Sequence, residues 1–197
     1  MDWKTLTVNQ YEQLNDLYNL DRSRFTTNAI EVLFGVKRAD VSVPLAEYNR
    51  LLGELAFFST PMPKGKVKNT YTLNGREYVV DLNLVAFSAV QYQDLMTYAK
   101  GDKRLSDMLS CVVVPKGHKY NDGYDLEQAK EDIGSMGVVD GTAITAFFFI
   151  YWKAFTRTFR DSLLPRLLET VPKEKREAVE KKMSQLVEAM EVVQTMG

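Results

Sequence analysis

A single β-hairpin signal interrupts a chain whose other periodic segments are helical. The stretch NTYTLNGREYVVDLNL (residues 69–84) alternates apolar and polar residues on both sides of Asn74-Gly75. This dipeptide favours a two-residue turn, because Asn and Gly both tolerate the positive φ that such turns require. A two-stranded hairpin is only marginally stable alone in water. We therefore expect this hairpin to pack on helices or to gain strands from a partner.

The N-terminal residues 1–60 predict a compact helical unit. Apolar side chains recur at helical spacing in three segments, which are residues 8–20, 27–36 and 43–60. Thr26 or Thr27 can cap the second of these helices, and Gly35 is placed to end it. We expect the unit to end where the helical spacing is lost, at residue 60.

Residues 61–68 (PMPKGKVK) form a break between this unit and the rest of the chain. They contain two prolines, one glycine and three lysines without an acidic residue between them, which is typical of a linker or an exposed strap. A nucleic-acid contact would also use lysines, but no aromatic stacking platform accompanies them. The composition therefore favours a solvated linker.

Residues 69–170 are expected to hold the hairpin and a helical core. The segment SCVVVP (residues 110–115) fits either a helix end or a short buried strand. A long helix is expected to begin at Asp140 or Thr142, and Pro165 to interrupt or kink it. Its apolar run GTAITAFFFIYW is twelve residues long, whereas crossing a bilayer takes about 20. We expect a buried core helix there and no membrane contact.

Residues 171–197 predict a C-terminal amphipathic helix. Five of its apolar residues are spaced 4-3-4-3, which is the spacing of a coiled-coil or bundle seam. They are Val179, Met183, Leu186, Met190 and Val193. The seam fits docking on the same chain and also pairing with a partner chain, and both interpretations stay open. Together the segments predict a predominantly α-helical α+β fold, with a helical N-terminal unit, one β-hairpin and a helical bundle.

The loop VPKGHKYNDGYD (residues 114–125) contains the only histidine of the chain. Its two glycines and its Asn-Asp-Gly run favour turns, and Asp125 is placed to cap the helix that follows. Tyr120 and Tyr124 can lay their rings over the core while their hydroxyls stay in water. An ordered loop between helices is one interpretation, and a protein-binding loop is the other. The binding interpretation would use Lys116, His118, Tyr120, Asn121 and Tyr124.

With one histidine and one cysteine, the chain has few of the side chains that catalytic and metal sites commonly use. A hydrolase triad needs a nucleophile, a base and an orienting group, so an enzyme would have to use His118 with Asp122 or Asp125. A structural zinc site needs four Cys or His ligands, and the loop lacks the oxygen spacing of an EF-hand. Cys111 lies in an apolar run, which favours a buried, inert thiol. We expect no catalytic residue, cofactor, metal or small-molecule substrate.

Charge and the first residues bear on partners and location. The formal net charge is −1, so no overall field favours nucleic acid or an anionic membrane. The first residues include an acid and lack the apolar stretch of a signal peptide. We therefore expect a cytoplasmic protein that binds other proteins.

The order of several motifs resembles a known family. The stretches PLAEYNRLLGELAFFSTPMP, YTLNGREYVVDLN, AVQYQDLMTYAKGD and MLSCVVVPKGHKYNDGYD follow one another in the chain. Together they resemble small assembly proteins from the structural modules of tailed bacteriophages, in particular tail assembly chaperone-like proteins. The similarity covers roughly residues 3–159, and none of its motifs is catalytic.

The resemblance implies a non-enzymatic role in virion assembly. Such chaperones bind the helical tape-measure protein in the host cytoplasm, keep it soluble and help tail-tube subunits polymerise around it. Self-association is also compatible with this role. The alternative is a structural virion component, such as a neck, connector or minor tail protein, which would remain in the virion.

Overall fold

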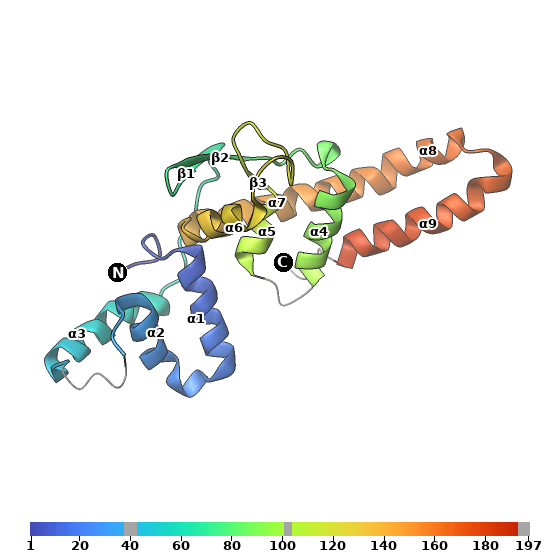
Figure 1. Cartoon of the computed structure of the whole chain (residues 1–197). Coiled ribbons are helices and arrows are strands. Elements are labelled where there is room, and N and C mark those ends of the chain that lie inside the picture. The colour runs from blue at the N-terminus through green and yellow to red at the C-terminus, as the bar shows by residue number, and fades with distance from the viewer. Residues whose placement is uncertain (38–42, 101–103, 193–197) are drawn as a thin grey trace.

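The chain folds into a predominantly helical α+β structure, seen in a computed structural model that describes residues 1–37, 43–100 and 104–192 (Figure 1). The N-terminal helices lie at one end of the molecule. A small sheet and several helices form the middle, and the C-terminal helices extend from it as an arm. The predicted fold class is thus confirmed.

The N-terminal helices are joined by short turns. The elements are α1 (Val8–Leu20), a 3-10 turn (Arg22–Arg24), α2 (Phe25–Phe34), α3 (Leu45–Glu54) and a second 3-10 turn (Leu55–Ser59). Gly35, at φ 70°, ends α2 in the left-handed conformation that was predicted for it. The prediction that Thr26 or Thr27 caps α2 is wrong, because the helix already begins at Phe25. Asp21 caps the preceding 3-10 turn instead, and this turn runs directly into α2.

The hairpin belongs to a three-stranded antiparallel sheet. Strands β1 (Thr70–Leu73) and β2 (Arg76–Val80) pair as predicted, and β3 (Val113–Pro115) pairs with the other side of β2. Asn74 (φ 46°) and Gly75 (φ 79°) both adopt the positive φ expected of the turn. The hairpin therefore gains its third strand from its own chain. In the segment SCVVVP, α5 ends at Ser110, Cys111 and Val112 form a turn, and Val113–Pro115 form the strand.

Helices from the middle of the chain lie beside this sheet. The elements are a 3-10 turn (Leu84–Ala86), α4 (Ala89–Lys100), α5 (Leu105–Ser110), α6 (Leu126–Gly134) and α7 (Val138–Thr158). Asp125 caps α6 as predicted, with its side chain accepting two backbone N–H bonds. Helix α7 begins at Val138 rather than at the predicted Asp140 or Thr142. The amide of Val138 donates to the carbonyl of Leu6 (2.8 Å), so the first turn needs no side-chain cap there.

The C-terminal arm is a long helical rod with a returning helix. A π-helical segment (Phe159–Leu163) joins α7 to α8 (Leu164–Thr170), and α9 (Lys173–Val192) runs back beside them (Figure 1). Pro165 is the second residue of α8, two residues after the π segment ends. Its missing N–H and its ring disturb the preceding turn of an α-helix, and the wider π turn accommodates that disturbance. Pro165 thus changes the hydrogen-bond pattern without ending the rod.

Helix α7 connects two hydrophobic clusters. At its start, Val138 and Val139 pack with buried residues of α1, α2 and α3. Further along, Ile144, Phe148 and Trp152 pack with the sheet and with α4, α5 and α6. The spacing of these three residues places them on one side of α7. The opposite side of the helix is left to face outward.

A buried carboxylate fastens the sheet to α6. Asp132 is only 1% exposed, and its oxygens accept hydrogen bonds from Tyr78 (2.6 Å), Asn74 (3.0 Å) and Arg76 (3.1 Å). Burial alone would raise the pKa of Asp132, but these three donors and the amide of Gln128 (3.4 Å) outweigh burial and lower it. The hairpin is therefore held on α6 by a satisfied, ionised side chain.

Candidate functional site

The predicted binding loop is ordered by its own contacts. His118 Nδ1 lies 3.1 Å from the carbonyl oxygen of Asp122, and its ring meets that of Tyr124 edge-on, with centroids 5.7 Å apart. The hydroxyl of Tyr124 accepts a bond from the amide of Asn121 (3.2 Å), which has φ 55°. Lys116 points to the sheet, where it pairs with Glu77 of β2 (2.7 Å). The imidazole is exposed and meets a backbone oxygen and an aromatic ring.

Tyr120 differs from the other four predicted binding residues of the loop, because it is buried. Its hydroxyl donates to Asp94 Oδ2 (2.8 Å) and lies 4.0 Å from the sulfur of Cys111. The prediction of a wet hydroxyl is therefore wrong for Tyr120: α4 supplies a carboxylate that takes the place of water. Cys111 itself is fully buried, and burial raises the pKa of its thiol to about 12. A thiol held in its neutral form is a poor nucleophile.

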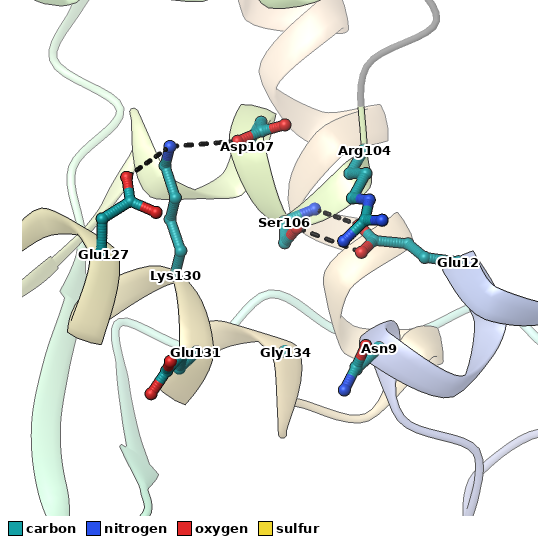
Figure 2. Close-up of a pocket in the computed structure, with 9 residues that line it drawn as sticks. All are labelled: Asn9, Glu12, Arg104, Ser106, Asp107, Glu127, Lys130, Glu131 and Gly134. Carbon is teal, nitrogen blue, oxygen red and sulfur yellow. Dashed lines mark hydrogen bonds and ion pairs between the residues drawn. The ribbon is translucent and has the colours of Figure 1, made fainter.

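A polar cavity of about 470 Å³ lies between α1, α5 and α6 (Figure 2). Glu12 of α1 reaches the first turn of α5, where its carboxylate accepts bonds from the amide (2.6 Å) and the hydroxyl (3.1 Å) of Ser106. Burial raises the pKa of Glu12, although these bonds and the nearby Arg104 act in the opposite direction. Helix α5 has no side-chain cap of its own, so Glu12 serves as its cap from another helix.

The other side of this cavity is an ion-pair cluster. Figure 2 shows Lys130 between Asp107 and Glu127, at 3.2 and 3.1 Å from their oxygens. Burial opposes the charge of Lys130, but the two carboxylates outweigh it and raise the pKa of the amine. Glu12, Asp107, Glu127 and Lys130 are thus engaged inside the cavity, whereas Glu131 also lines it and accepts a bond from Gln128 (3.2 Å). This arrangement joins α5 to α6 and α1.

A second, apolar groove lies on the outward side of α7. Its volume is about 880 Å³, and α7 forms one wall while the strap of residues 62–67 and the end of β2 form the other. Its lining from α7 is mostly apolar, and the strap and the sheet add further apolar side chains. The lining residues are Met62, Pro63, Lys64, Gly65, Lys66, Val67, Asn69, Val80, Leu82, Thr142, Ala143, Ala146, Phe147 and Ile150.

The strap is fixed on α7 rather than loose in solvent. A side chain at Gly65 would place its Cβ 2.3 Å from the carbonyl oxygen of Val139, so only glycine allows this approach. The hydroxyl of Thr142 lies 3.3 Å from the sulfur of Met62, and Lys68 pairs with Asp140 of α7 (3.3 Å). Proline and glycine in this segment therefore shape a strap docked on α7, and the solvated linker that the composition favoured is not observed.

Helix α7 presents large apolar side chains to the outside next to the groove. Phe147 is 37% exposed, Ile150 66% and Tyr151 49%. The predicted core helix is thus buried on one side only. The continuous helix Val138–Arg166 is long and apolar enough to cross a membrane, but core helices of water-soluble proteins meet the same criteria of length and composition. An exposed apolar surface beside a groove is the usual mark of an interaction site.

The predicted C-terminal seam lies on the returning helix of the arm. Val179 of α9 is partly buried, and Met183, Leu186 and Met190 follow it on the same helix. The side chains of these three, and Val193 as a whole, lie outside the described residues. Whether the seam serves its own chain or a partner therefore stays a prediction.

Within the described ranges, no group of three or more His, Cys, Asp and Glu residues is placed to hold a metal ion. Comparison of the chain with protein-family models, with curated proteins and with solved structures finds no match. The groove was missed from the sequence because its two walls come from segments about 80 residues apart. The sequence did carry one signal of an exposed apolar side. Phe147 and Ile150 lie at other positions around α7 than the buried Ile144, Phe148 and Trp152, so the helix is apolar on more than one side.

Proposed function

We propose that this protein acts by binding other proteins and not by catalysis, as an assembly factor of tailed bacteriophages. The observation that carries the proposal is the apolar groove with its exposed neighbours Phe147, Ile150 and Tyr151 on α7. Contiguous apolar surface is rarely left exposed to water in monomeric proteins, and it commonly forms the centre of a protein interface. Among the described residues, the buried carboxylates Glu12 and Asp132 are engaged by internal donors.

The finer proposal is a tail assembly chaperone that shields apolar segments of the tape-measure or tail-tube protein in the host cytoplasm. It is supported by the sequence resemblance described above and by the outward apolar side of α7. A chaperone of this kind needs a firm scaffold and an accessible apolar surface. The buried Asp132 network and the docked strap provide the first, and the groove provides the second.

Co-purification tests the proposal with a matched pair of variants. The chain is co-expressed with the tape-measure or tail-tube protein encoded in the same genome. Ile150→Asp (66% exposed, at the groove) is compared with Leu20→Asp (82% exposed, on α1). We expect Leu20→Asp to retain the partner as the wild type does, and Ile150→Asp to lose it roughly tenfold or more, since central apolar residues dominate interfaces. Equal retention by both variants would contradict the role of the groove.

Mass spectrometry of purified virions separates the two versions of the proposal. A chaperone acts during assembly and leaves the finished particle, so we expect no peptides of this chain in virions. Peptides at a fixed stoichiometry would instead support the alternative of a neck, connector or minor tail protein.

A further inference from the structure

We propose that the groove on α7 binds an amphipathic helix whose apolar ridge is flanked by acidic residues, and that Lys64 and Lys66 hold those acids. This inference rests on the proposed function and gives the chemistry of the partner. It comes from the shape of the groove, from the charges on its rim and from the rigidity of the strap that carries them.

The shape of the groove suits a helix. Ala143, Ala146, Phe147 and Ile150 line it from α7 at spacings of three and four residues, so they form a ridge along the helix. Ala146 is exposed and small enough for a partner helix to approach α7 closely, whereas Ala143 lies against Gly65 of the strap, and Phe147 and Ile150 supply apolar area. A helix laid in a groove beside such a ridge is a common mode of peptide recognition.

The charges on the rim have one sign. The lining contains two lysines and no carboxylate. Lys68 is already paired with Asp140 at 3.3 Å, whereas no carboxylate among the residues described by the structure pairs with Lys64 or Lys66. Both of these lysines are exposed. Positive charge at the edge of an apolar groove selects a partner with acidic residues beside its apolar ones, because rim charges steer association and disfavour like charges.

The lysines are carried by a fixed piece of backbone. Gly65, which lies between them, packs directly on the carbonyl of Val139, and Met62 contacts Thr142. The positions from which both side chains extend are therefore set before a partner arrives. Such preorganisation reduces the entropy that binding costs.

Two other occupants are less compatible with this geometry. A bilayer surface is flat and cannot fill a groove that the strap walls on one side. A second copy that docked through its own groove would bring two further lysines and no carboxylate from that lining, so Lys64 and Lys66 would gain no acidic partner there. An acidic helix satisfies both the groove and its rim.

Two labelled synthetic helices of about 21 residues test the inference by fluorescence anisotropy. They share one leucine ridge, with Glu flanking it in the first peptide and Lys in the second. For the wild type we expect the Glu peptide to bind roughly five- to tenfold more tightly at low salt, as two exposed ion pairs allow. K64E/K66E should reverse this preference. K4E/K119E, with the same change in net charge outside the groove, should keep it.

Any other result overturns the inference, and each of the following outcomes identifies a different reason for its failure. If both peptides bind equally and Ile150→Asp abolishes both, the groove binds helices as proposed but the lysines do not select the partner. If neither peptide binds, no helix of this kind is the occupant, and the co-purification above decides the proposed function separately. A dimer in light scattering that Ile150→Asp dissociates would identify a second copy. Sedimentation with vesicles containing phosphatidylserine, lost in Ile150→Asp, would identify a membrane.

Discussion

The carboxylate of Glu12 on α1 accepts a 2.6 Å hydrogen bond from the backbone amide of Ser106, in the first turn of α5. One helix thus caps another across 94 residues of sequence. The bond satisfies an amide that has no partner within its own helix. It also fixes the mutual position of α1 and α5, against which α7 packs.

Removing this cap should destabilise the protein. For Glu12→Ala we expect a loss of about 1–2 kcal/mol in the free energy of unfolding, because the buried amide of Ser106 is left without an acceptor. Urea denaturation followed by circular dichroism measures this loss. Glu12→Gln keeps an acceptor oxygen and should lose less than Glu12→Ala at pH 5. Equal losses in both variants would contradict the capping role.

Glu12 should also contribute a pH dependence of its own. Its pKa is raised in the folded protein above the ordinary value of 4.5, so the folded state binds the proton more tightly than the unfolded state does. The stability gained from this proton is complete below pH 4.5 and is lost as the pH rises through the folded-state pKa. As the pH rises from 4 to 7, the free energy of unfolding of the wild type should therefore decrease relative to that of Glu12→Gln.

Asp132 should show the opposite sign. Its pKa is lowered from 3.8, so its contribution is present above pH 3.8 and is lost as the pH falls through the folded-state pKa. For Asp132→Asn we expect a loss of about 2–4 kcal/mol at pH 7, since Arg76 and Tyr78 lose a buried, charged acceptor. Acid unfolding of wild type and variant should converge at low pH. A constant difference between them at all pH values would contradict the ionised state of Asp132.

Gly65→Ala should displace the strap from α7. The new Cβ would meet the carbonyl oxygen of Val139 at 2.3 Å, and such overpacking costs about 1–3 kcal/mol. Gly53→Ala is the matched control, because its Cβ meets nothing within 4 Å and it lies inside α3. That control should be stabilising by up to about 1 kcal/mol. Thermal unfolding of the two variants gives the comparison, and a neutral Gly65→Ala would show that the strap is not docked.

Cys111 should be unreactive in the folded protein. Its thiol is buried, and burial raises its pKa to about 12, so almost no thiolate is present at pH 8. We expect Ellman's reagent to label the chain only after denaturation, with one thiol per chain. Rapid labelling under native conditions would mean that the cover formed by α4 and the loop opens readily.

Local features of the fold were predictable from the sequence. The turn at Asn74-Gly75, the end of α2 at Gly35 and the cap of α6 at Asp125 all depend on residues within one turn of the feature. The start of α2 also depends on nearby residues, but it was predicted wrongly. Asp21 fixes a 3-10 turn that leads into the helix, and this turn competes successfully with the caps offered by Thr26 and Thr27.

Features that depend on distant contacts were not predictable in the same way. No spacing rule connects Glu12 to Ser106, or the strap around Gly65 to Val139. Even the apolar run of α7 was ambiguous, because a helix that is apolar on all sides does not reveal which side will be covered. The candidate groove lies where neighbouring elements no longer cover α7, and only the folded structure shows where this happens.

The position of β3 has a consequence for synthesis on the ribosome. Strand β2 is central in the sheet, but its partner β3 is separated from it by α4 and α5. Translation proceeds at roughly 5–20 residues per second, so Val113 and Val114 leave the exit tunnel a few seconds after the hairpin does. During that interval one edge of β2 is open to pairing with neighbouring nascent chains. Crowded polysomes should therefore be the place where this protein is most prone to misassembly.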